Sequence, residues 1–81
     1  MYEIYGTDGC DHCQKAKQLL TQYDKPYTFI DVAEDEDITA AFFNRFPGVK
    51  TVPQIVLDDD HIGGYNELKN SLTLDQIESI L

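Results

Sequence analysis

Two cysteines, the only ones in the chain, lie three positions apart where a predicted strand gives way to a predicted helix. Residues 10–13 read Cys-Asp-His-Cys, after the break Gly-Thr-Asp-Gly at residues 6–9 and before a helical pattern. A strand, a loop and a helix must therefore meet at the two sulfur atoms. A pair at this spacing can be half of a metal site, a structural disulfide, or a dithiol that cycles between reduced and oxidised forms.

The segments on either side of the cysteines predict a β-α-β unit. Residues 2–5 and 27–32 carry the alternating or β-branched side chains typical of strands, and residues 11–23 form an amphipathic helical pattern. A right-handed crossover makes the two strands parallel and places the helix on one face of the sheet. The length and β-branched content of residues 27–32 predict a central strand.

A second helix is predicted after the acidic residues 34–37. Acidic side chains in the first turn offset the positive end of a helix, and a Pro-Gly pair at residues 47–48 ends the pattern. The apolar residues that recur at helical spacing between these two points are Ile38, Ala41, Phe42 and Phe46.

A hairpin and a last helix complete the predicted order. Residues 54–57 and 61–62 predict two strands, with the three aspartates between them as the turn. Residues 65–71 are predicted to be helical, and the capping-box spacing of residues 73–76 predicts that the helix restarts at Thr73. The side chains expected to face inward from this segment are Leu74, Ile77 and Ile80 or Leu81.

The length and charge of the chain limit its function. A chain of 81 residues forms one small domain, residues 1–81, and a hydrophobic content of 42% is enough for a compact core. The formal net charge of −9 repels nucleic acid and anionic membrane surfaces. The sequence contains neither a secretory signal pattern nor a long apolar segment. We therefore expect a monomeric, cytoplasmic protein that binds neither nucleic acid nor membranes.

This context favours one of the three roles for the cysteine pair. The order β-α-β-α-β-β-α, with paired cysteines at the first strand-to-helix junction, is the thioredoxin-like arrangement, an α/β fold with a four-stranded mixed sheet. A zinc site needs four ligands, and beyond the cysteines only His12 and His61 are available, at unsuitable spacing. A bridge between Cys10 and Cys13 closes too short a loop to add much stability. Redox chemistry is therefore favoured, and no metal is expected.

Four motifs in the right order resemble the dithiol glutaredoxins, in particular the short bacterial and phage forms. They are residues 9–13, Lys-Ala-Lys at 15–17, Thr-Val-Pro-Gln at 51–54, and His-Ile-Gly-Gly-Tyr at 61–65. Nearly the whole chain is covered, so it is similar to a single glutaredoxin domain. The resemblance implies a thiol-disulfide oxidoreductase that uses glutathione as co-substrate and reduces protein disulfides and glutathione mixed disulfides.

The resemblance assigns the catalytic roles to Cys10 and Cys13. Cys10 matches the family's nucleophile, and unpaired N–H groups at the start of a helix favour its thiolate form. Cys13 lies one turn further on the same side, which suits a resolving thiol that closes a disulfide with Cys10. Asp11 and His12 replace the usual Pro-Tyr between the cysteines. The negative charge of Asp11 disfavours a nearby thiolate, whereas a protonated His12 favours it.

The resemblance also implies a groove for glutathione beside the cysteines. Pro53 matches a cis-proline that faces them, the Val52 backbone pairs with the glutathione main chain, and glycines 63–64 let the γ-glutamyl end approach the last helix. Relatives commonly carry an Asp after Gly-Gly-Tyr, where this chain has Asn66 and Glu67. The expected glutathione contacts are Lys15, Lys50, Thr51, Val52, Pro53, Gly64, Tyr65, Asn66 and Glu67.

Other functions are open at this point. A thioredoxin-type redoxin reduced by a flavoprotein reductase would share the dithiol, but glycines 63–64 and Tyr65 resemble a glutathione groove. Carriers that hold an iron-sulfur cluster through one cysteine and glutathione more often have Gly, Phe and Ser after that cysteine, a pattern that this chain lacks. An interaction module without chemistry would not need paired cysteines. By resemblance the partners are disulfide-containing or glutathionylated proteins, with ribonucleotide reductase as one candidate substrate.

Overall fold

The computed structural model describes residues 1–80, with the side chains of residues 1–74. Seven elements follow one another in the predicted order β-α-β-α-β-β-α. They are β1 (Tyr2–Gly6), α1 (Asp11–Gln22), β2 (Tyr27–Asp31), α2 (Glu36–Arg45), β3 (Gln54–Leu57), β4 (Asp60–Gly63) and α3 (Tyr65–Ile80).

The four strands form one mixed sheet in the order β2-β1-β3-β4. β1 pairs with β2 in parallel and with β3 in antiparallel fashion, so that Ile4 lies opposite both Phe29 and Ile55. The prediction that the second strand is central was wrong, because β2 is an edge strand and most of its side chains are only half-buried. β-branched composition records a strand's fit to a pleated surface, whereas its place in the sheet depends on long-range pairing.

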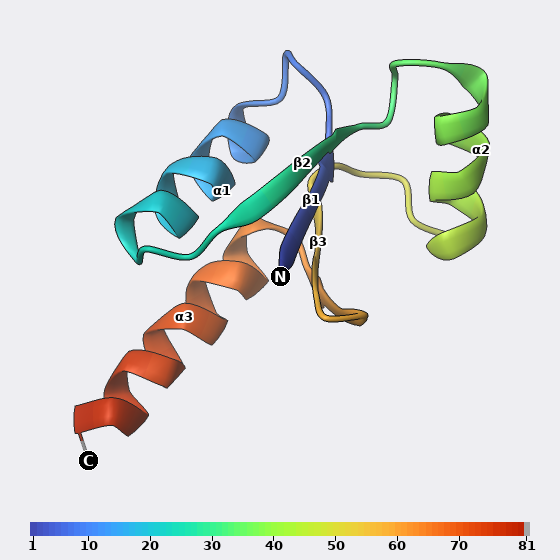
Figure 1. Ribbon diagram of the computed structural model, residues 1–81. Helices are drawn as coiled ribbons and strands as arrows, with labels where there is room; N and C mark the ends of the chain where they lie inside the picture. Colours follow the sequence, from blue (N-terminus) through green and yellow to red (C-terminus); the bar gives the residue numbers. More distant parts are fainter. Residues whose placement is uncertain (81) are drawn as a thin grey trace.

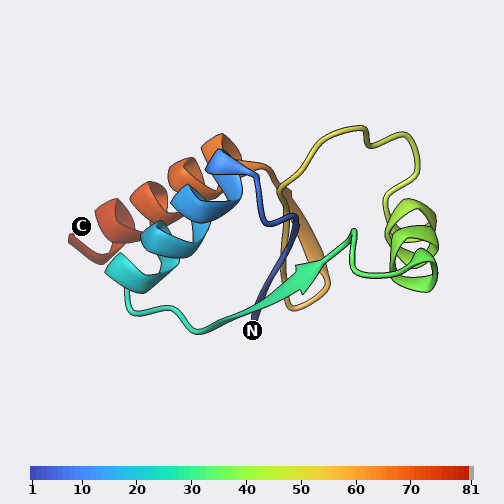
Figure 2. The ribbon, with the colours of Figure 1, turned by 90° about the horizontal axis from the view of Figure 1, so that it is seen from above.

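The helices cover both faces of the sheet (Figures 1 and 2). α1 and α3 lie side by side on one face, and α2 lies on the other. Successive residues of a strand point to opposite faces, so neighbours such as Ile55 and Val56 enter different cores. The α1/α3 core consists of Tyr2, Ile4, Ala16, Leu20, Ile55, Leu68 and Leu72. The α2 core consists of Tyr5, Val32, Phe42, Phe46 and Val56.

The acidic segment before α2 caps that helix, as its composition predicted. The Asp35 carboxylate accepts a hydrogen bond of 2.9 Å from the Ile38 N–H, and Glu36 and Asp37 lie in the first turn. At the other end of the helix, Arg45 donates a hydrogen bond to the hydroxyl of Tyr5. The first contact caps the N-terminal end of α2, and the second joins its C-terminal end to β1.

The turn between β3 and β4 is shorter than the sequence predicted. Asp58 and Asp59 both have positive φ angles, 48° and 73°, as a two-residue hairpin turn requires. Asp60 therefore belongs to β4 instead of the turn, and it pairs with Leu57. The pairing then skips Ile62, which forms a bulge just before the chain reaches the glycines.

The last helix is continuous, and the predicted restart at Thr73 was wrong. The Thr73 hydroxyl donates to the carbonyl of Lys69 at 2.8 Å, one turn back, so it does not act as an N-cap. Leu68 and Leu72 are buried against the sheet, whereas Leu74, which was expected to face inward, is 60% exposed. The burial predicted for Ile77, Ile80 and Leu81 lies outside the described side chains. None of the helices within residues 1–80 is long and apolar enough to cross a membrane.

Candidate active site

The cysteine pair lies at the junction between β1 and α1. Cys10 is the N-cap residue, with φ −93° and ψ 112°, and it is partly exposed. Cys13 lies one turn into the helix and is fully buried. The two sulfur atoms are joined as a disulfide, and the Cα atoms are 5.2 Å apart. An accessible first sulfur and a buried second one match the division into attacking and resolving cysteine.

The start of α1 supplies hydrogen-bond donors to the outer sulfur. The backbone N–H of Cys13 donates to Sγ of Cys10 at 3.1 Å, so the sulfur takes the place that a Ser or Asp oxygen holds in an ordinary N-cap. The N-terminal end of the helix dipole points at the same atom. In the reduced protein both effects favour a thiolate on Cys10, which is the form that attacks a disulfide.

Gly6 lets the end of β1 pass directly behind the buried sulfur. A Cβ at this position would lie 2.5 Å from Sγ of Cys13 and 3.1 Å from the ring of Phe29. No other residue fits there without displacing the disulfide. The sequence analysis treated Gly6 only as a strand breaker, and a glycine four residues before the first cysteine was the one signal of this role.

The loop before β3 lies against the outer sulfur. The peptide bond between Val52 and Pro53 is cis, as the resemblance implied, and Pro53 is buried. The carbonyl oxygen of Val52 is 3.7 Å from Sγ of Cys10, within reach of a thiol donor. Two segments that are about forty residues apart in the sequence are thus brought together at the reactive atom.

Gln54 fixes this loop through a side-chain hydrogen bond, a role that the sequence analysis missed. Its side chain is 7% exposed, and Nε2 donates to the carbonyl of Thr51 at 3.0 Å. The amide oxygen therefore faces His61, whose Nε2 lies 2.7 Å away and must carry the proton of that hydrogen bond. The His61 ring in turn packs against Phe46, at 4.7 Å between ring centroids. The His61 side chain thus links Gln54 to the α2 core.

The glycine segment and the first turn of α3 form the other side of the site. A Cβ on Gly64 would lie 3.6 Å from the carbonyl oxygen of Pro53, so the two backbones run close together. The ring of Tyr65 lies 5.8 Å from that of His12, with 30° between their planes. The structure therefore brings Pro53, Gly64, Tyr65 and His12 to the neighbourhood of the cysteines.

Glu67 does not point away from the fold. Its Oε1 accepts a hydrogen bond of 3.2 Å from the N–H of Gly64, and its side chain fills the space beside Gly63, which has a φ of 124°. A carboxylate of the protein thus occupies the donor at the start of α3. Asn66, the other predicted contact on this turn, is exposed.

The two predicted lysines lie in different places. Lys50 is exposed next to Thr51 and lines a pocket together with Val52. Lys15 is exposed on α1, one turn after Asp11 on the same face of the helix. The glutathione contacts assigned to both lysines stay predictions.

The arrangement suits two-electron chemistry at sulfur. It offers one accessible sulfur with hydrogen-bond donors aimed at it and one buried sulfur within bonding distance. Among the residues with described side chains, no three His, Cys, Asp or Glu residues are grouped so that they could hold a metal ion.

Comparison with known proteins identifies the family. The glutaredoxin family model matches residues 2–62. Glutaredoxin 1 of Salmonella typhimurium is 38% identical over 73 residues, which cover 82% of this chain and 83% of the relative. Glutaredoxin 1 of Escherichia coli is 38% identical over 71 residues, with 79% and 82% covered. The chain spans 65% of the length of a third relative, glutaredoxin 1 of Rickettsia typhi.

Solved structures agree with this assignment. Glutaredoxin 1 from Francisella tularensis, complexed with cacodylate, is 32% identical with a TM-score of 0.71, and the match covers 96% of this chain and 95% of that one. A buckwheat glutaredoxin-glutathione complex has a TM-score of 0.78 at 24% identity, with 99% and 74% covered, and supports the fold. The chain therefore belongs to the glutaredoxin family of thiol-disulfide oxidoreductases and has the thioredoxin-like fold of that family.

Proposed function

We propose that this protein uses glutathione to reduce glutathione mixed disulfides and protein disulfides, with Cys10 as nucleophile and Cys13 as resolving thiol. The observation that carries the proposal is the approach of the Val52 carbonyl to within 3.7 Å of the Cys10 sulfur. A peptide-like co-substrate joined to Cys10 would lie along this backbone and could pair with it. The buckwheat relative was solved with glutathione, which supports the same ligand here.

We expect the residues around Cys10 to bind the peptide groups and the charged ends of glutathione. The backbone of Val52 beside Cys10 suits its peptide groups, and the start of α3 suits a carboxylate. Lys50 is the cation beside this loop. Glu67 is the expected partner of the γ-glutamyl ammonium, and for this role its side chain has to leave the Gly64 N–H.

Removal of glutathione from a protein needs only one cysteine. The Cys10 thiolate attacks the glutathione sulfur of the mixed disulfide, and the protein thiolate leaves and takes up a proton. Cys10 is then bonded to glutathione. A second glutathione thiolate attacks this bond, which regenerates the Cys10 thiolate and yields oxidised glutathione.

Reduction of a protein disulfide needs both cysteines. Cys10 attacks one sulfur and forms a mixed disulfide with the protein, and the Cys13 thiolate then attacks Cys10 and releases the second protein thiol. The two electrons leave the dithiol, which ends as the Cys10–Cys13 disulfide. Two glutathione molecules reduce it again. Among protein substrates we propose ribonucleotide reductase, from the family resemblance, and we place the activity in the reducing cytoplasm.

Two serine variants test these roles. We expect Cys13→Ser to retain the removal of glutathione from a mixed disulfide and to lose the reduction of protein disulfides, whereas Cys10→Ser loses both. The measurement is NADPH consumption coupled through glutathione and glutathione reductase. Activity that survives in Cys10→Ser would overturn the assignment.

The reductant is tested separately. The wild-type protein is coupled to glutathione with glutathione reductase, and in a parallel assay to thioredoxin reductase without glutathione. We expect turnover only with glutathione. Turnover only with thioredoxin reductase would establish the alternative redoxin function, and a visible absorption band in anaerobically purified protein would indicate an iron-sulfur carrier.

A further inference from the structure

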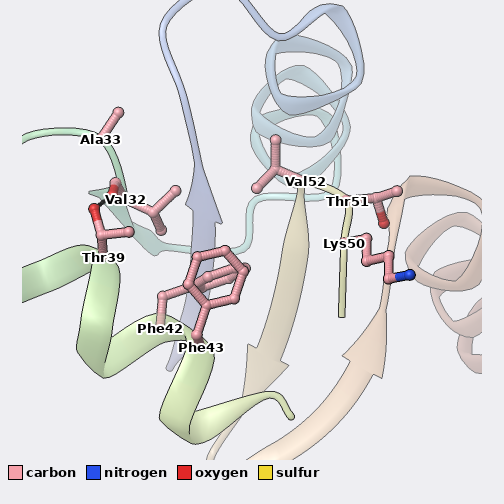
Figure 3. Close-up of a pocket in the computed structure, with 8 residues that line it drawn as sticks. All are labelled: Val32, Ala33, Thr39, Phe42, Phe43, Lys50, Thr51 and Val52. Atoms are coloured by element: carbon pink, nitrogen blue, oxygen red, sulfur yellow. Dashed lines mark hydrogen bonds between the residues drawn. The ribbon is translucent and has the colours of Figure 1, made fainter. Parts of the chain in front are cut away.

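A pocket of about 260 Å³ opens on the α2 side of the sheet, next to the loop that faces Cys10. We call it the Phe43 pocket. Val32, Ala33 and Thr39 line one side, Phe42 and Phe43 of α2 form its base, and Val52 closes it toward the loop (Figure 3). Lys50 and Thr51 line the pocket beside Val52, and these three residues were predicted to contact glutathione, whereas the other five lining residues were not.

The walls of the Phe43 pocket call for an apolar occupant. Phe43 is 52% exposed, one of only three large apolar side chains that are exposed among residues 1–74. The hydroxyl of Thr39 already donates to the carbonyl of Val32 at 2.6 Å, so it offers no free donor. Glutathione has no apolar side chain that could fill such a space. The pocket therefore suits a larger hydrophobic group than the co-substrate carries.

One residue, Val52, connects the Phe43 pocket with the reactive sulfur. Val52 lines the pocket, and its carbonyl oxygen lies 3.7 Å from Sγ of Cys10. An extended chain advances about 3.3 Å per residue, so a polypeptide bonded to Cys10 and lying along Val52 brings a neighbouring side chain to the pocket.

Charge argues for a polypeptide over an anionic small molecule or lipid. Residues 34–37, which directly follow Ala33, are all acidic and exposed. Lys50 is the cation at the opposite rim, and its side chain points away from the phenylalanine rings (Figure 3). An anionic headgroup would meet repulsion at the acidic rim.

We propose that the Phe43 pocket holds a large apolar side chain of the protein substrate, within two residues of the cysteine that bonds to Cys10. The proposal rests on the function proposed above and names its preferred substrates, which are disulfides flanked by hydrophobic residues. In the reaction Cys10 attacks the flanked cysteine, the other half of the disulfide leaves as a thiol, and Cys13 then releases the bound half. The dithiol loses two electrons and the substrate disulfide gains them.

Two blocked pentapeptide disulfides test this preference, one with leucine on each side of the cysteine and one with serine on each side. Protein that has been reduced and freed of reductant is mixed with each peptide, and the rate of Cys10–Cys13 oxidation is measured without glutathione. Partial burial of one leucine gives an expected preference of about tenfold for the leucine peptide. Equal rate constants for the two peptides, or no reaction with either, would overturn the proposal.

Two serine variants locate the preference on the molecule. In Phe43→Ser the ratio of the two rate constants should fall to about twofold or less, because the base of the pocket is lost. Leu74→Ser removes a similarly exposed apolar side chain on α3 and should keep the wild-type ratio. Thermal unfolding confirms that both variants are folded. An unchanged ratio in Phe43→Ser contradicts the proposal, as does a ratio lost equally in Leu74→Ser.

The proposed co-substrate and the proposed occupant of the Phe43 pocket can be refuted independently of each other. Loss of the glutathione-coupled activity, with the leucine preference intact, would refute the proposed co-substrate and leave the pocket assignment standing. A second copy of the chain is the competing occupant. Sedimentation showing a wild-type dimer that Phe43→Ser dissociates would assign the Phe43 pocket to self-association and overturn the substrate proposal.

Discussion

The two faces of the sheet differ in how completely they are covered. On the α1/α3 side two helices lie against the strands, and Ile4, Leu20 and Leu68 have no exposed surface. On the α2 side a single helix packs through aromatic rings, and the Phe43 pocket stays open beside it. Arg45 reaches across this side from α2 to the hydroxyl of Tyr5.

This difference separates two tasks between the two faces of one sheet. The closely packed side holds Cys13 and the start of α1, so the geometry of the dithiol is fixed by a buried core. The open side contacts the loop before β3 through the pocket, which Val52 lines, and through Gln54, which bonds to Thr51. The comparison predicts that substitutions on the two sides will differ in which property they change, as well as in the size of the change.

The largest effect is expected for Gly6→Ala, on the closely packed side. The new Cβ would meet Sγ of Cys13 at 2.5 Å, and overpacking of this kind should cost about 3 kcal/mol in the free energy of unfolding. Urea denaturation of the oxidised protein measures the loss. Gly9→Ala is the matched control, because a Cβ there has no neighbour within 4 Å. Equal stability of the two variants would show that the closely packed side can accommodate a Cβ at residue 6.

Gln54→Leu should have the next largest effect, and it should act on the loop. The variant leaves the Thr51 carbonyl and His61 without their partner, at a cost of about 2 kcal/mol in the free energy of unfolding. We also expect a higher KM for disulfide substrates, because Val52 is held less firmly. His61→Phe is the control, since it keeps a ring against Phe46 and the bond from Gln54 to Thr51. A lower stability with an unchanged KM would separate Gln54 from the site.

Arg45→Met probes how α2 is attached to the sheet. The variant loses the hydrogen bond to Tyr5 and ion pairs of 3.6 Å with Glu3 and 3.5 Å with Asp59. Since partly exposed ion pairs contribute little, we expect a loss of about 1 kcal/mol in the free energy of unfolding that changes little with salt. Tyr5→Phe removes only the hydroxyl and should account for most of it. A loss that disappears at high salt would assign the attachment to the ion pairs.

The smallest effect is expected for Asp11→Pro, at the start of α1. Removal of an exposed charge near Cys10 should raise the thiolate fraction at a fixed acidic pH by about two- to fivefold, because screened pairs are worth up to about 1 kcal/mol. Ultraviolet thiolate absorbance is measured in a Cys13→Ser background, which isolates Cys10. Asp37→Asn, in the first turn of α2, is the matched control and should change nothing. An unchanged or smaller thiolate fraction contradicts the prediction.

The order of the elements could be predicted because its signals are local. Glycine and proline breaks mark the loops, the acidic cluster before residue 38 marks a helix start, and helical spacing marks α1. The place of Cys10 at a helix N-terminus follows from the same local pattern and is confirmed by its hydrogen bond with the Cys13 N–H.

The errors and omissions involve contacts that composition alone does not specify, some between distant segments and some within one helix. Local composition could not show that β1 takes β3 as its second neighbour and leaves β2 at the edge. It also could not show that the Thr73 hydroxyl bonds back to Lys69 within a continuous helix, since threonine also serves as an N-cap residue in proteins. The contact of Gln54 with His61 depends on how the hairpin closes, so its function was not visible in the sequence.

The hydrogen bond from the Gly64 N–H to the Glu67 carboxylate affects how a ligand can bind at the start of α3. A ligand carboxylate that arrives there does not fill a vacant donor, because it exchanges with an anion that the protein already carries. Such an exchange adds little net affinity for the ligand. The apparent affinity equals the intrinsic affinity multiplied by the fraction of molecules in which Glu67 has left the Gly64 N–H. We therefore expect a ligand that is also anchored at Cys10 to displace the internal carboxylate more readily than a free anion does.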